Sequence, residues 1–217
     1  MRKLALAVAL LATTLCGFAQ DIQLPEPDFS IKSLSVTKSL QRRHSSRKFA
    51  SIELSNQEIS NICWAACGIS RDENHRTAPT AMNRQEIRLF AFTKDGVYEY
   101  NAKDNLLQKK ADGDQRELLA KSGDKKGFRQ NFVLDAPLCL LMVIDFDIFG
   151  KNDTKAMQMG CVDAGNVSEN INLYCQSVGL ATVPRATHDT NAIRKLLNFS
   201  KKQLPIMNNP VGYPVER

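Results

Sequence analysis

The feature that most constrains the fold of this chain is a long helical pattern between residues 154 and 178. Apolar residues recur there every three or four positions, the spacing that places them on one face of a helix. The expected stripe comprises Met157, Cys161, Ala164, Val167 with Ser168, Ile171, Cys175 and Val178. Gly179 is expected to end the helix. Gly160 and Gly165 each cost a helix about 1 kcal/mol relative to alanine, which predicts that another element packs closely against them.

The segments around this helix predict a mixed fold. APLCLLMVIDF, residues 136–146, is a continuous apolar run typical of a strand that is buried on both faces. Further strands are predicted in residues 87–93, 97–101, 180–187 and 203–214, and further helices in residues 55–69 and 192–199. Ser55 and Glu58 form a capping box at the start of the first of these helices. This order predicts an α+β domain with a mainly antiparallel central sheet flanked by helices.

Residues 1–19 have the layout of a secretory signal peptide. Arg2 and Lys3 precede an apolar run that is too short to span a bilayer, and small residues follow it. Cleavage is expected after Ala19, which predicts an exported protein, with the periplasm as its destination. No other segment is apolar for long enough to predict a membrane span.

Two alternatives for the N-terminus are a lipoprotein and a buried N-terminal helix. The lipoprotein is less favoured, because Leu15 precedes Cys16 at a position where a small residue is usual. With the signal peptide removed, residues 20–37 are predicted to be a polar leader that lies over the surface. Residues 38–217 are then one domain, a size that is ordinary for a single hydrophobic core.

The charge of the mature chain argues against a nucleic-acid partner. The full sequence has 29 basic residues, and removing the two in the signal peptide leaves 27 against 23 acidic residues, a net charge of about +4. These charges are scattered rather than gathered into a stripe. Five cysteines remain in the mature chain, and an odd number does not indicate a disulfide framework.

Cys63 and Cys67 lie four residues apart on a predicted helix, where metal ligation or redox pairing is conceivable. No histidine or carboxylate lies at a supporting spacing, so buried small side chains are the favoured interpretation and no metal site is predicted.

A cationic cluster, QRRHSSRKF, occupies residues 41–49. A charge run of this kind is usually a solvated surface stretch, and binding of an anion is the alternative. Arginine is the residue type that matches a phosphate with two parallel hydrogen bonds. The rest of the chain therefore decides whether the cluster has a phosphate to hold.

Four stretches, in this order along the chain, together resemble the FMN-dependent nitroreductase family. RHSSRKF is similar to its Arg-x-Ser-x-Arg segment, and APTAMNRQ to its Pro-Ser-x-x-Asn-x-Gln loop, with Thr80 in place of serine. DAGNVSENINLYCQSVGLATVP resembles its long helix and Gly-Leu-Gly-x-x-Pro turn, with Ala181 in place of the second glycine. LPIMNNPVGYP resembles its terminal strand. The similarity spans residues 38–217 and implies the nitroreductase fold.

The resemblance implies an FMN site. The residues that it assigns to FMN are Arg43, His44, Ser45, Arg47, Pro79, Thr80, Ala81, Asn83, Val183, Pro184, Arg185, Ala186 and Arg217. Arg43 and Arg47 would bind the phosphate with the Ser45 hydroxyl, and His44 would contact the flavin edge. Arg42 and Lys48 fall outside the motif and are expected to be solvated.

The later motif residues are expected to form the wall beside the flavin ring. Asn83 would meet the flavin through its amide, or else cap its own turn. Gln85 matches the motif but could equally hold the loop in place. Arg185 departs from the small or apolar residues expected there, and it would reach substrate or pyrimidine oxygens or point to water. Arg217 could reach the phosphate.

No protein side chain is predicted to be catalytic. The three histidines, His44, His75 and His188, have no companions that would make a triad, which is consistent with a cofactor that carries the redox chemistry. The resemblance implies a homodimer that reduces nitroaromatic, quinone or similar acceptors with NAD(P)H in ping-pong fashion. Because GVYEYN and GDQR resemble a subgroup of azoline-peptide dehydrogenases, oxidation of a bound substrate is one alternative. A non-catalytic exported binding module is another.

Overall fold

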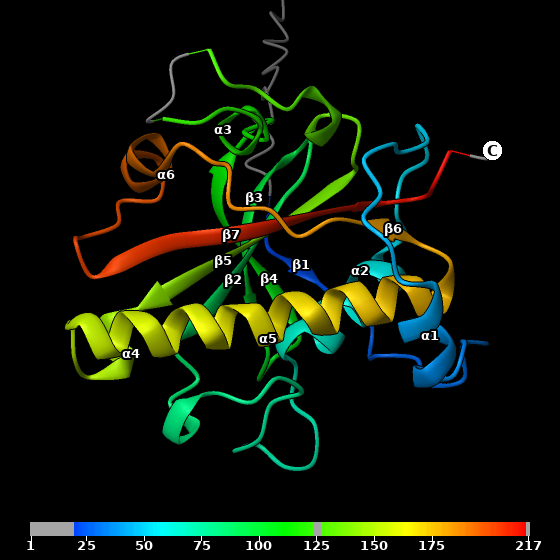
Figure 1. Cartoon of the computed structure of the whole chain (residues 1–217), viewed down its shortest axis with the longest axis horizontal. Helices are drawn as coiled ribbons and strands as arrows, with labels where there is room; N and C mark the ends of the chain where they lie inside the picture. The colour runs from blue at the N-terminus through cyan, green and yellow to red at the C-terminus, as the bar shows by residue number, and fades with distance from the viewer. Residues whose placement is uncertain (1–19, 124–126, 216–217) are drawn as a thin grey trace, which may run out of the picture.

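The computed structural model describes residues 20–123 and 127–215, so the expected signal peptide and Arg217 lie outside the described residues. One sheet of seven strands forms the centre, in the order β1-β4-β3-β2-β5-β7-β6, and all of its strand pairs are antiparallel (Figure 1). The strands are β1 Ile22–Gln23, β2 Ile87–Phe92, β3 Gly96–Asn101, β4 Leu106–Asp112, β5 Leu138–Asp145, β6 Ala181–Thr182 and β7 Gln203–Gly212. The predicted α+β class and antiparallel sheet are confirmed.

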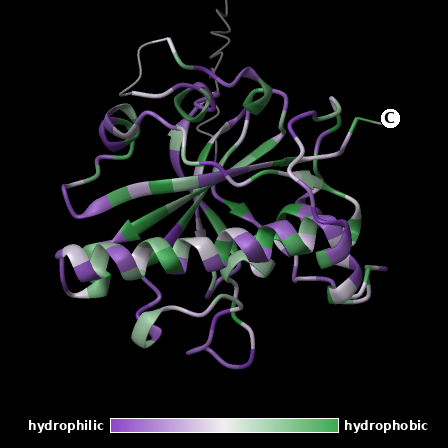
Figure 2. Ribbon diagram, in the orientation of Figure 1, coloured by the Kyte–Doolittle hydropathy of each residue, from purple (hydrophilic) through white to green (hydrophobic). Residues whose placement is uncertain are grey.

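Helices cover both faces of this sheet. They are α1 Val36–Arg42, α2 Asn56–Cys67, α3 Glu117–Ala120, α4 Phe146–Phe149, α5 Thr154–Val178 and α6 Thr190–Leu196, with short 3-10 helices η1 Ala81–Asn83 and η2 Asn131–Val133. The core on one face joins the sheet to α2 and α5, and the core on the other face joins it to α3, η2 and α6. Strand β5 has every residue buried, as its continuous apolar run predicts, because helices pack on both of its sides (Figure 2).

The long helix α5 begins and ends where the sequence predicts. Asp153 caps its first turn by accepting a hydrogen bond from Ala156 N at 2.8 Å, and Gly179 ends it in the left-handed conformation at φ 82°. A side chain at Gly160 would lie 2.6 Å from Ile144 Cδ1, so the predicted close packing is confirmed at this position.

Two expectations for α5 are wrong, one about its apolar stripe and one about close packing at a glycine. Cys161 is exposed, because the neighbouring residue Gly160 is the one that faces β5. Gly165 has open space beside it: apart from its chain neighbours and the backbone of its own helix, no heavy atom of the described residues lies within 4 Å of the position a Cβ would take.

Helix α2 has the capping box that the sequence predicts. Ser55 Oγ accepts from Glu58 N, and Glu58 Oε2 accepts from Ser55 N at 2.7 Å. Its Cys63 is buried and Cys67 half-buried, and both are free thiols. Burial raises the pKa of Cys67 to about 12, against the opposing influence of the nearby Arg76 charge, so the thiol is neutral.

Two strands were not predicted. Strand β4 carries Lys109 and Lys110 and lacks a clear alternation, and strand β1 comes from the leader, which was expected only to cover the surface. Ile22 pairs with Leu107 in the register of these two strands, and the next leader residue, Leu24, is 3% exposed. The leader therefore supplies an edge strand and part of the core.

Strands β2 and β3 are paired over only half of their length. Phe90 lies opposite Glu99, and the pairing continues toward the turn to Phe92 opposite Val97. Residues 87–89 have no partner on β3, although they stay paired with β5 on their other side. The sheet therefore has a gap between β2 and β3 at the end away from their turn.

None of the helices in the described ranges is long and apolar enough to cross a membrane.

Candidate functional site

The cationic loop of residues 43–47 lies beside the end of the sheet. Ser46 N donates to Thr182 O on β6 at 3.0 Å, and Phe49, two residues after the loop, pairs with Pro214 after β7. These contacts fix the C-terminal end of the loop, while the side chains of Arg43 and Arg47 are exposed. Arg42 and Lys48 are also exposed, as predicted.

The two motif arginines are available to an anion. In the described part of the chain, no ion pair involves Arg43 or Arg47. Ser45 is exposed between them, and His44 Nδ1 lies 3.1 Å from Arg42 O. A small cavity of about 90 Å³, which His44 lines together with the end of α5 and with β6, adjoins the loop. This donor set fits a phosphate, because its positive charges are not neutralised.

The second motif loop, residues 79–85, is fixed to the middle of α5. Ala81 N donates to Asp163 Oδ2 at 2.7 Å, and Asn166 Nδ2 donates to Pro79 O at 3.3 Å. Three residues of this loop have positive φ, namely Met82 at 56°, Asn83 at 52° and Gln85 at 55°. Non-glycine residues rarely adopt this conformation, so the loop is held in a strained shape by its contacts.

The polar side chains of this loop contact one another. Asn83 Nδ2 donates to Asn74 O at 2.9 Å, and its Oδ1 accepts from Gln85 Nε2 at 3.1 Å. Thr80 Oγ1 accepts from Gln85 N at 2.9 Å. Asn83 therefore contributes to the stability of its own loop and Gln85 holds the loop in place. The flavin contact expected of Asn83 stays a prediction.

Arg185 does not point to water, one of the two directions expected of it. Its side chain is directed inward, where Nη1 donates to Leu119 O and to Asn208 Oδ1, each at 2.7 Å, and Nε donates to Gln130 Oε1 at 2.8 Å. Only 9% of the residue is exposed, and burial lowers its pKa to about 10. The expectation that Arg185 points to water is wrong, because acceptors from three segments hold the guanidinium inside. Its contact with substrate or pyrimidine oxygens stays a prediction.

The backbone beside Arg185 is fixed to β7. Arg185 N donates to Asn208 O at 3.0 Å, and Asn208 N donates back to Arg185 O at 2.7 Å. Val183 is buried, Pro184 is half-buried and Ala186 is exposed. This strand end is therefore rigid and presents Ala186 to solvent.

The structure does not bring the two motif loops together within one chain. Loop 43–47 lies by the end of α5, where the small cavity includes Gln176, whereas loop 79–85 contacts Asp163 and Asn166. Ten residues of helix separate Asn166 from Gln176, or about 15 Å along the axis. A site that uses both loops of a single chain would have to span this distance.

A buried acidic pair behind loop 79–85 was missed by the sequence. Glu86 is 0% exposed, and neither of its carboxylate oxygens has a hydrogen-bond partner among the described residues. Burial, together with the neighbouring Asp163 carboxylate, raises the pKa of Glu86 to about 7. The two residues are far apart in sequence, so only the packing of α5 against β2 reveals them.

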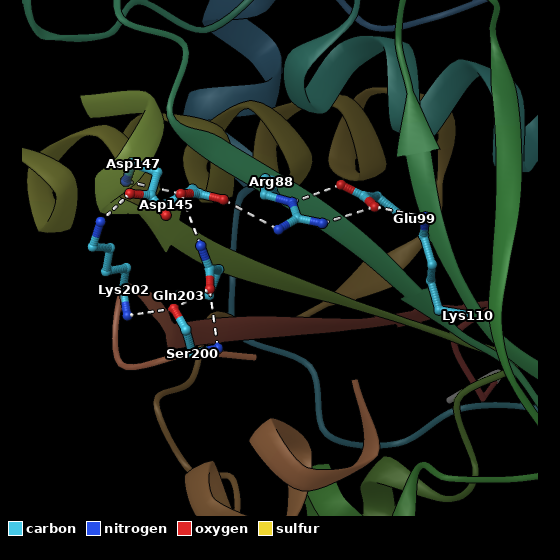
Figure 3. Close-up of polar contacts among 8 residues, drawn as sticks. All are labelled: Arg88, Glu99, Lys110, Asp145, Asp147, Ser200, Lys202 and Gln203. Atoms are coloured by element: carbon cyan, nitrogen blue, oxygen red, sulfur yellow. Dashed lines mark hydrogen bonds and ion pairs between the residues drawn. The ribbon is translucent and has the colours of Figure 1, made fainter. Parts of the chain in front are cut away.

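A polar network crosses the sheet next to this region (Figure 3). Arg88 donates to both carboxylate oxygens of Glu99, at 2.7 and 2.9 Å, and to Asp145 at 3.1 Å, and Lys110 Nζ lies 3.0 Å from Glu99. Although burial opposes it, these two cations keep the pKa of Glu99 below its ordinary value. These four side chains carry two positive and two negative charges, so their charges balance.

No set of three histidine, cysteine or acidic side chains in residues 20–123 and 127–215 is placed to hold a metal ion. The donor chemistry of the described residues is instead that of anion binding, at a loop beside the end of an antiparallel α+β sheet.

Comparison with known proteins identifies the family to which this α+β fold belongs. A family model described as the nitroreductase family matches residues 40–213, and the chain belongs to that family. A curated protein of Methanocaldococcus jannaschii, named as a nitroreductase, is 26% identical over 92% of this chain and 100% of its own length. A crystal structure from Ralstonia eutropha, also named as a nitroreductase, superposes with a TM-score of 0.81 at 27% identity, covering 91% of both chains. A nitroreductase family protein of Clostridium difficile shares the fold, with a TM-score of 0.59, 18% identity and coverage of 85% and 87%.

Proposed function

We propose that this member of the family is an FMN-dependent oxidoreductase that uses NAD(P)H to reduce nitroaromatic, quinone or similar electron-poor acceptors in two half-reactions at one site. The observation that carries the proposal is the loop of residues 43–47, whose two motif arginines are exposed and have no ion pair within the described ranges, beside the rigid strand end at residues 183–186. The flavin, when bound, would supply the redox chemistry.

The protein residues would bind and orient this cofactor. Arg43 and Arg47 would donate charge-assisted hydrogen bonds to its phosphate, assisted by the Ser45 hydroxyl. Backbone groups at the strand end of residues 183–186 would face the ring, and Arg185 would hold this backbone in place from behind. Arg217, beyond the described residues, is a further candidate for the phosphate.

We further propose that the functional unit is a homodimer. Loops 43–47 and 79–85 are separated along α5, so a second copy would allow one chain's first loop and the other chain's second loop to share a site. Two apolar side chains near loop 79–85 support this, because Val162 on α5 is 57% exposed and Met82 is 72% exposed. Exposed apolar side chains of this kind are typical of interfaces when they cluster.

The test of the FMN assignment is flavin binding by the mature chain. We expect the purified protein to show flavin absorbance, and the Arg43→Ala/Arg47→Ala variant to bind FMN at least about a hundredfold more weakly, since two charge-assisted hydrogen bonds are lost. The Arg42→Ala/Lys48→Ala variant is the matched control, because it removes two exposed cations that flank the same loop and should retain FMN.

A contrary result would redirect the assignment. Equal FMN retention by both double variants would show that loop 43–47 does not bind the phosphate. A colourless protein that leaves the fluorescence of added FMN unquenched would instead favour a non-catalytic binding module.

We also propose that residues 1–19 are a cleaved signal peptide and that the protein is exported to the periplasm. The basic start and short apolar run support this. The test is the N-terminal sequence of the protein recovered from a cell fraction outside the cytoplasm, which should begin at Gln20.

A further inference from the structure

A cleft of about 340 Å³ lies between the leader, the C-terminal part of α2 and the turn that joins β3 to β4. We call it the leader cleft. Its volume is in the lower part of the range for sites that bind small molecules. None of the residues assigned to FMN lines it, and neither do any others of loops 43–47 and 79–85. The cleft is therefore separate from the candidate flavin site.

Hydrogen bonds fix the leader as one wall of the leader cleft. Pro25 O accepts from Ser60 Oγ at 2.5 Å and from Asn105 Nδ2 at 2.7 Å, so this carbonyl is held by α2 and by the turn between β3 and β4 at once. The next carbonyl, Glu26 O, accepts from Gln57 Nε2 at 2.8 Å. Because these contacts order the wall in advance, a ligand would not have to order it on binding.

Two aromatic rings form a corner of the leader cleft. The ring centroids of Phe29 and Trp64 lie 4.7 Å apart, and the two planes are inclined at 64°. Trp64 Nε1 donates to Ile69 O at 2.8 Å, which fixes the orientation of the indole. Phe29 is 73% exposed, so much of its ring is open to a ligand. The faces of aromatic rings carry partial negative charge and attract cations.

The charged residues of the leader cleft also favour a cation. Glu26 and Asp104 line it, against one basic residue, Lys103, which leaves one excess negative charge. All three side chains are exposed, and within residues 20–123 and 127–215 none of them takes part in an ion pair. Asp104 Oδ2 accepts from Asn101 Nδ2 at 2.7 Å, a contact that leaves its charge in place.

The combination of aromatic faces with an excess negative charge indicates the kind of cation. A metal ion such as Ca²⁺ takes six or more oxygen ligands, and a primary ammonium has three N–H donors that need acceptors. A quaternary ammonium has no N–H group, and it is the cation that aromatic corners recognise through cation–π contacts. It also needs only the general attraction of nearby carboxylates rather than direct hydrogen bonds to them.

We propose that the leader cleft binds a small quaternary ammonium compound, with its cationic head against Phe29 and Trp64 and close to the carboxylates of Glu26 and Asp104. This site does not depend on flavin binding, because it shares no residue with the candidate flavin site. The two proposals can therefore succeed or fail separately.

The test uses choline as the probe and 3,3-dimethylbutan-1-ol as its neutral isostere, in which carbon replaces the charged nitrogen. Trp64 is the only tryptophan of the chain, so the indole N–H resonance in NMR spectra of the purified protein reports on this cleft directly. We expect choline to shift this resonance saturably, and the neutral isostere to bind about tenfold more weakly, because only the cation is attracted by the rings and the carboxylates. Sodium chloride at the same ionic strength should leave the resonance in place.

Two variants test the rings and the charges separately. Phe29→Leu keeps an apolar side chain but removes the ring, so choline should bind at least about threefold more weakly. Phe128→Leu is the matched control, since Phe128 is 46% exposed and does not line the cleft. Lys103→Met removes the one positive charge of the lining and should tighten choline binding about threefold. Lys201→Met, an exposed lysine elsewhere, is its control and should leave binding unchanged.

The proposal is wrong if choline leaves the Trp64 resonance unshifted, or if the neutral isostere binds as tightly as choline. It is also wrong if the Phe29→Leu protein binds choline as the wild type does, or if Lys103→Met fails to tighten binding. Because Phe29 and Lys103 are exposed, these two substitutions should leave the fold intact. FMN content, measured in the same samples, reports on the flavin assignment independently.

Discussion

The carboxylate of Asp163, on α5, accepts a hydrogen bond from the backbone N–H of Ala81, with 2.7 Å between the two atoms. This contact fixes loop 79–85, which contains three non-glycine residues with positive φ, to the longest helix of the protein. The same carboxylate lies beside the buried Glu86. The conformation of the loop and the protonation of Glu86 are therefore coupled through one side chain.

The first prediction concerns the pH dependence of stability. The pKa of Glu86 is about 7 in the folded protein and near its ordinary 4.5 when unfolded, so the folded state binds more protons between these values. The free energy of unfolding should therefore lose about 3 kcal/mol from this residue as pH rises from 4.5 to 7, and remain level above. Glu86→Gln should be close to wild type at pH 4.5 and about 3 kcal/mol more stable at pH 8.

Urea denaturation at several pH values measures this difference. Glu73→Gln is the control, because Glu73 is exposed and the variant should follow the wild-type curve. A Glu86→Gln variant that differs from wild type by the same amount at every pH would show that Glu86 does not change its protonation in this range.

The second prediction concerns Arg185. Arg185→Met leaves Leu119 O and Asn208 Oδ1 buried without a donor, so we expect a loss of about 3 kcal/mol in the free energy of unfolding. Arg185→Lys should lose less, since it keeps the charge, but a lysine cannot reach all three acceptors at once. Thermal denaturation measures both variants. Wild-type stability of Arg185→Met would contradict the structural role that we assign to this side chain.

The third prediction concerns the close packing of α5 on β5. Gly160→Ala places a methyl group 2.6 Å from Ile144 Cδ1 and should destabilise the protein by about 1–3 kcal/mol, although alanine favours helix. Ile144→Val removes the nearest atom, so the double variant should be more stable than the sum of the two single effects. Simple additivity in this double-mutant cycle would mean that the helix shifts away instead.

The fourth prediction tests the homodimer. Val162→Glu puts a charge on the exposed face of α5 and should convert the dimer into a folded monomer that has lost most of its FMN. Phe128→Glu is the control: this residue is 46% exposed and belongs to the loop after α3, on the opposite face of the sheet from α5. Light scattering and flavin absorbance measure both proteins. A Val162→Glu dimer with full FMN content would exclude this face as the interface.

The fifth prediction separates the two proposed enzyme activities. Under anaerobic conditions, NADH or NADPH should bleach the absorbance of the oxidised flavin, and a quinone should restore it. If neither nicotinamide bleaches the flavin, the reductase assignment fails and oxidation of a bound substrate becomes the leading assignment. The double variant Arg42→Ala/Lys48→Ala should behave as wild type in the same measurement.

Helices α2 and α5 and strand β5 could be predicted from the sequence because their signals are local. Ser55 with Glu58, and the glycine at position 179, mark helix ends within a few residues, and a fully apolar run marks a strand covered on both faces. Strand β1 could not be predicted, because it is defined by its pairing with a distant strand, as between Ile22 and Leu107. Strand β4 pairs with the neighbouring β3, but its polar sequence has no clear alternation that would have marked it as a strand.

The candidate site divides in the same way. The two motif loops could be located from their residue types, but the direction of the Arg185 side chain could not, since its acceptors come from residues 119, 130 and 208. The burial of Glu86 and the gap between β2 and β3 could not be predicted from the sequence either, because both result from how distant segments pack. Sequence motifs thus identified where ligands are expected, and the structure identified what holds those segments in place.

The position of β7 has a consequence for how the chain folds. This strand is the last in sequence but lies inside the sheet, between β5 and β6. Until residues 203–212 are synthesised and inserted, β5 has an open edge of unpaired backbone groups along a strand that is apolar up to Ile144, which is a strong template for aggregation. Completion of the sheet must therefore wait for the C-terminal strand, and a chain cut before Gln203 should be kept soluble only by a chaperone.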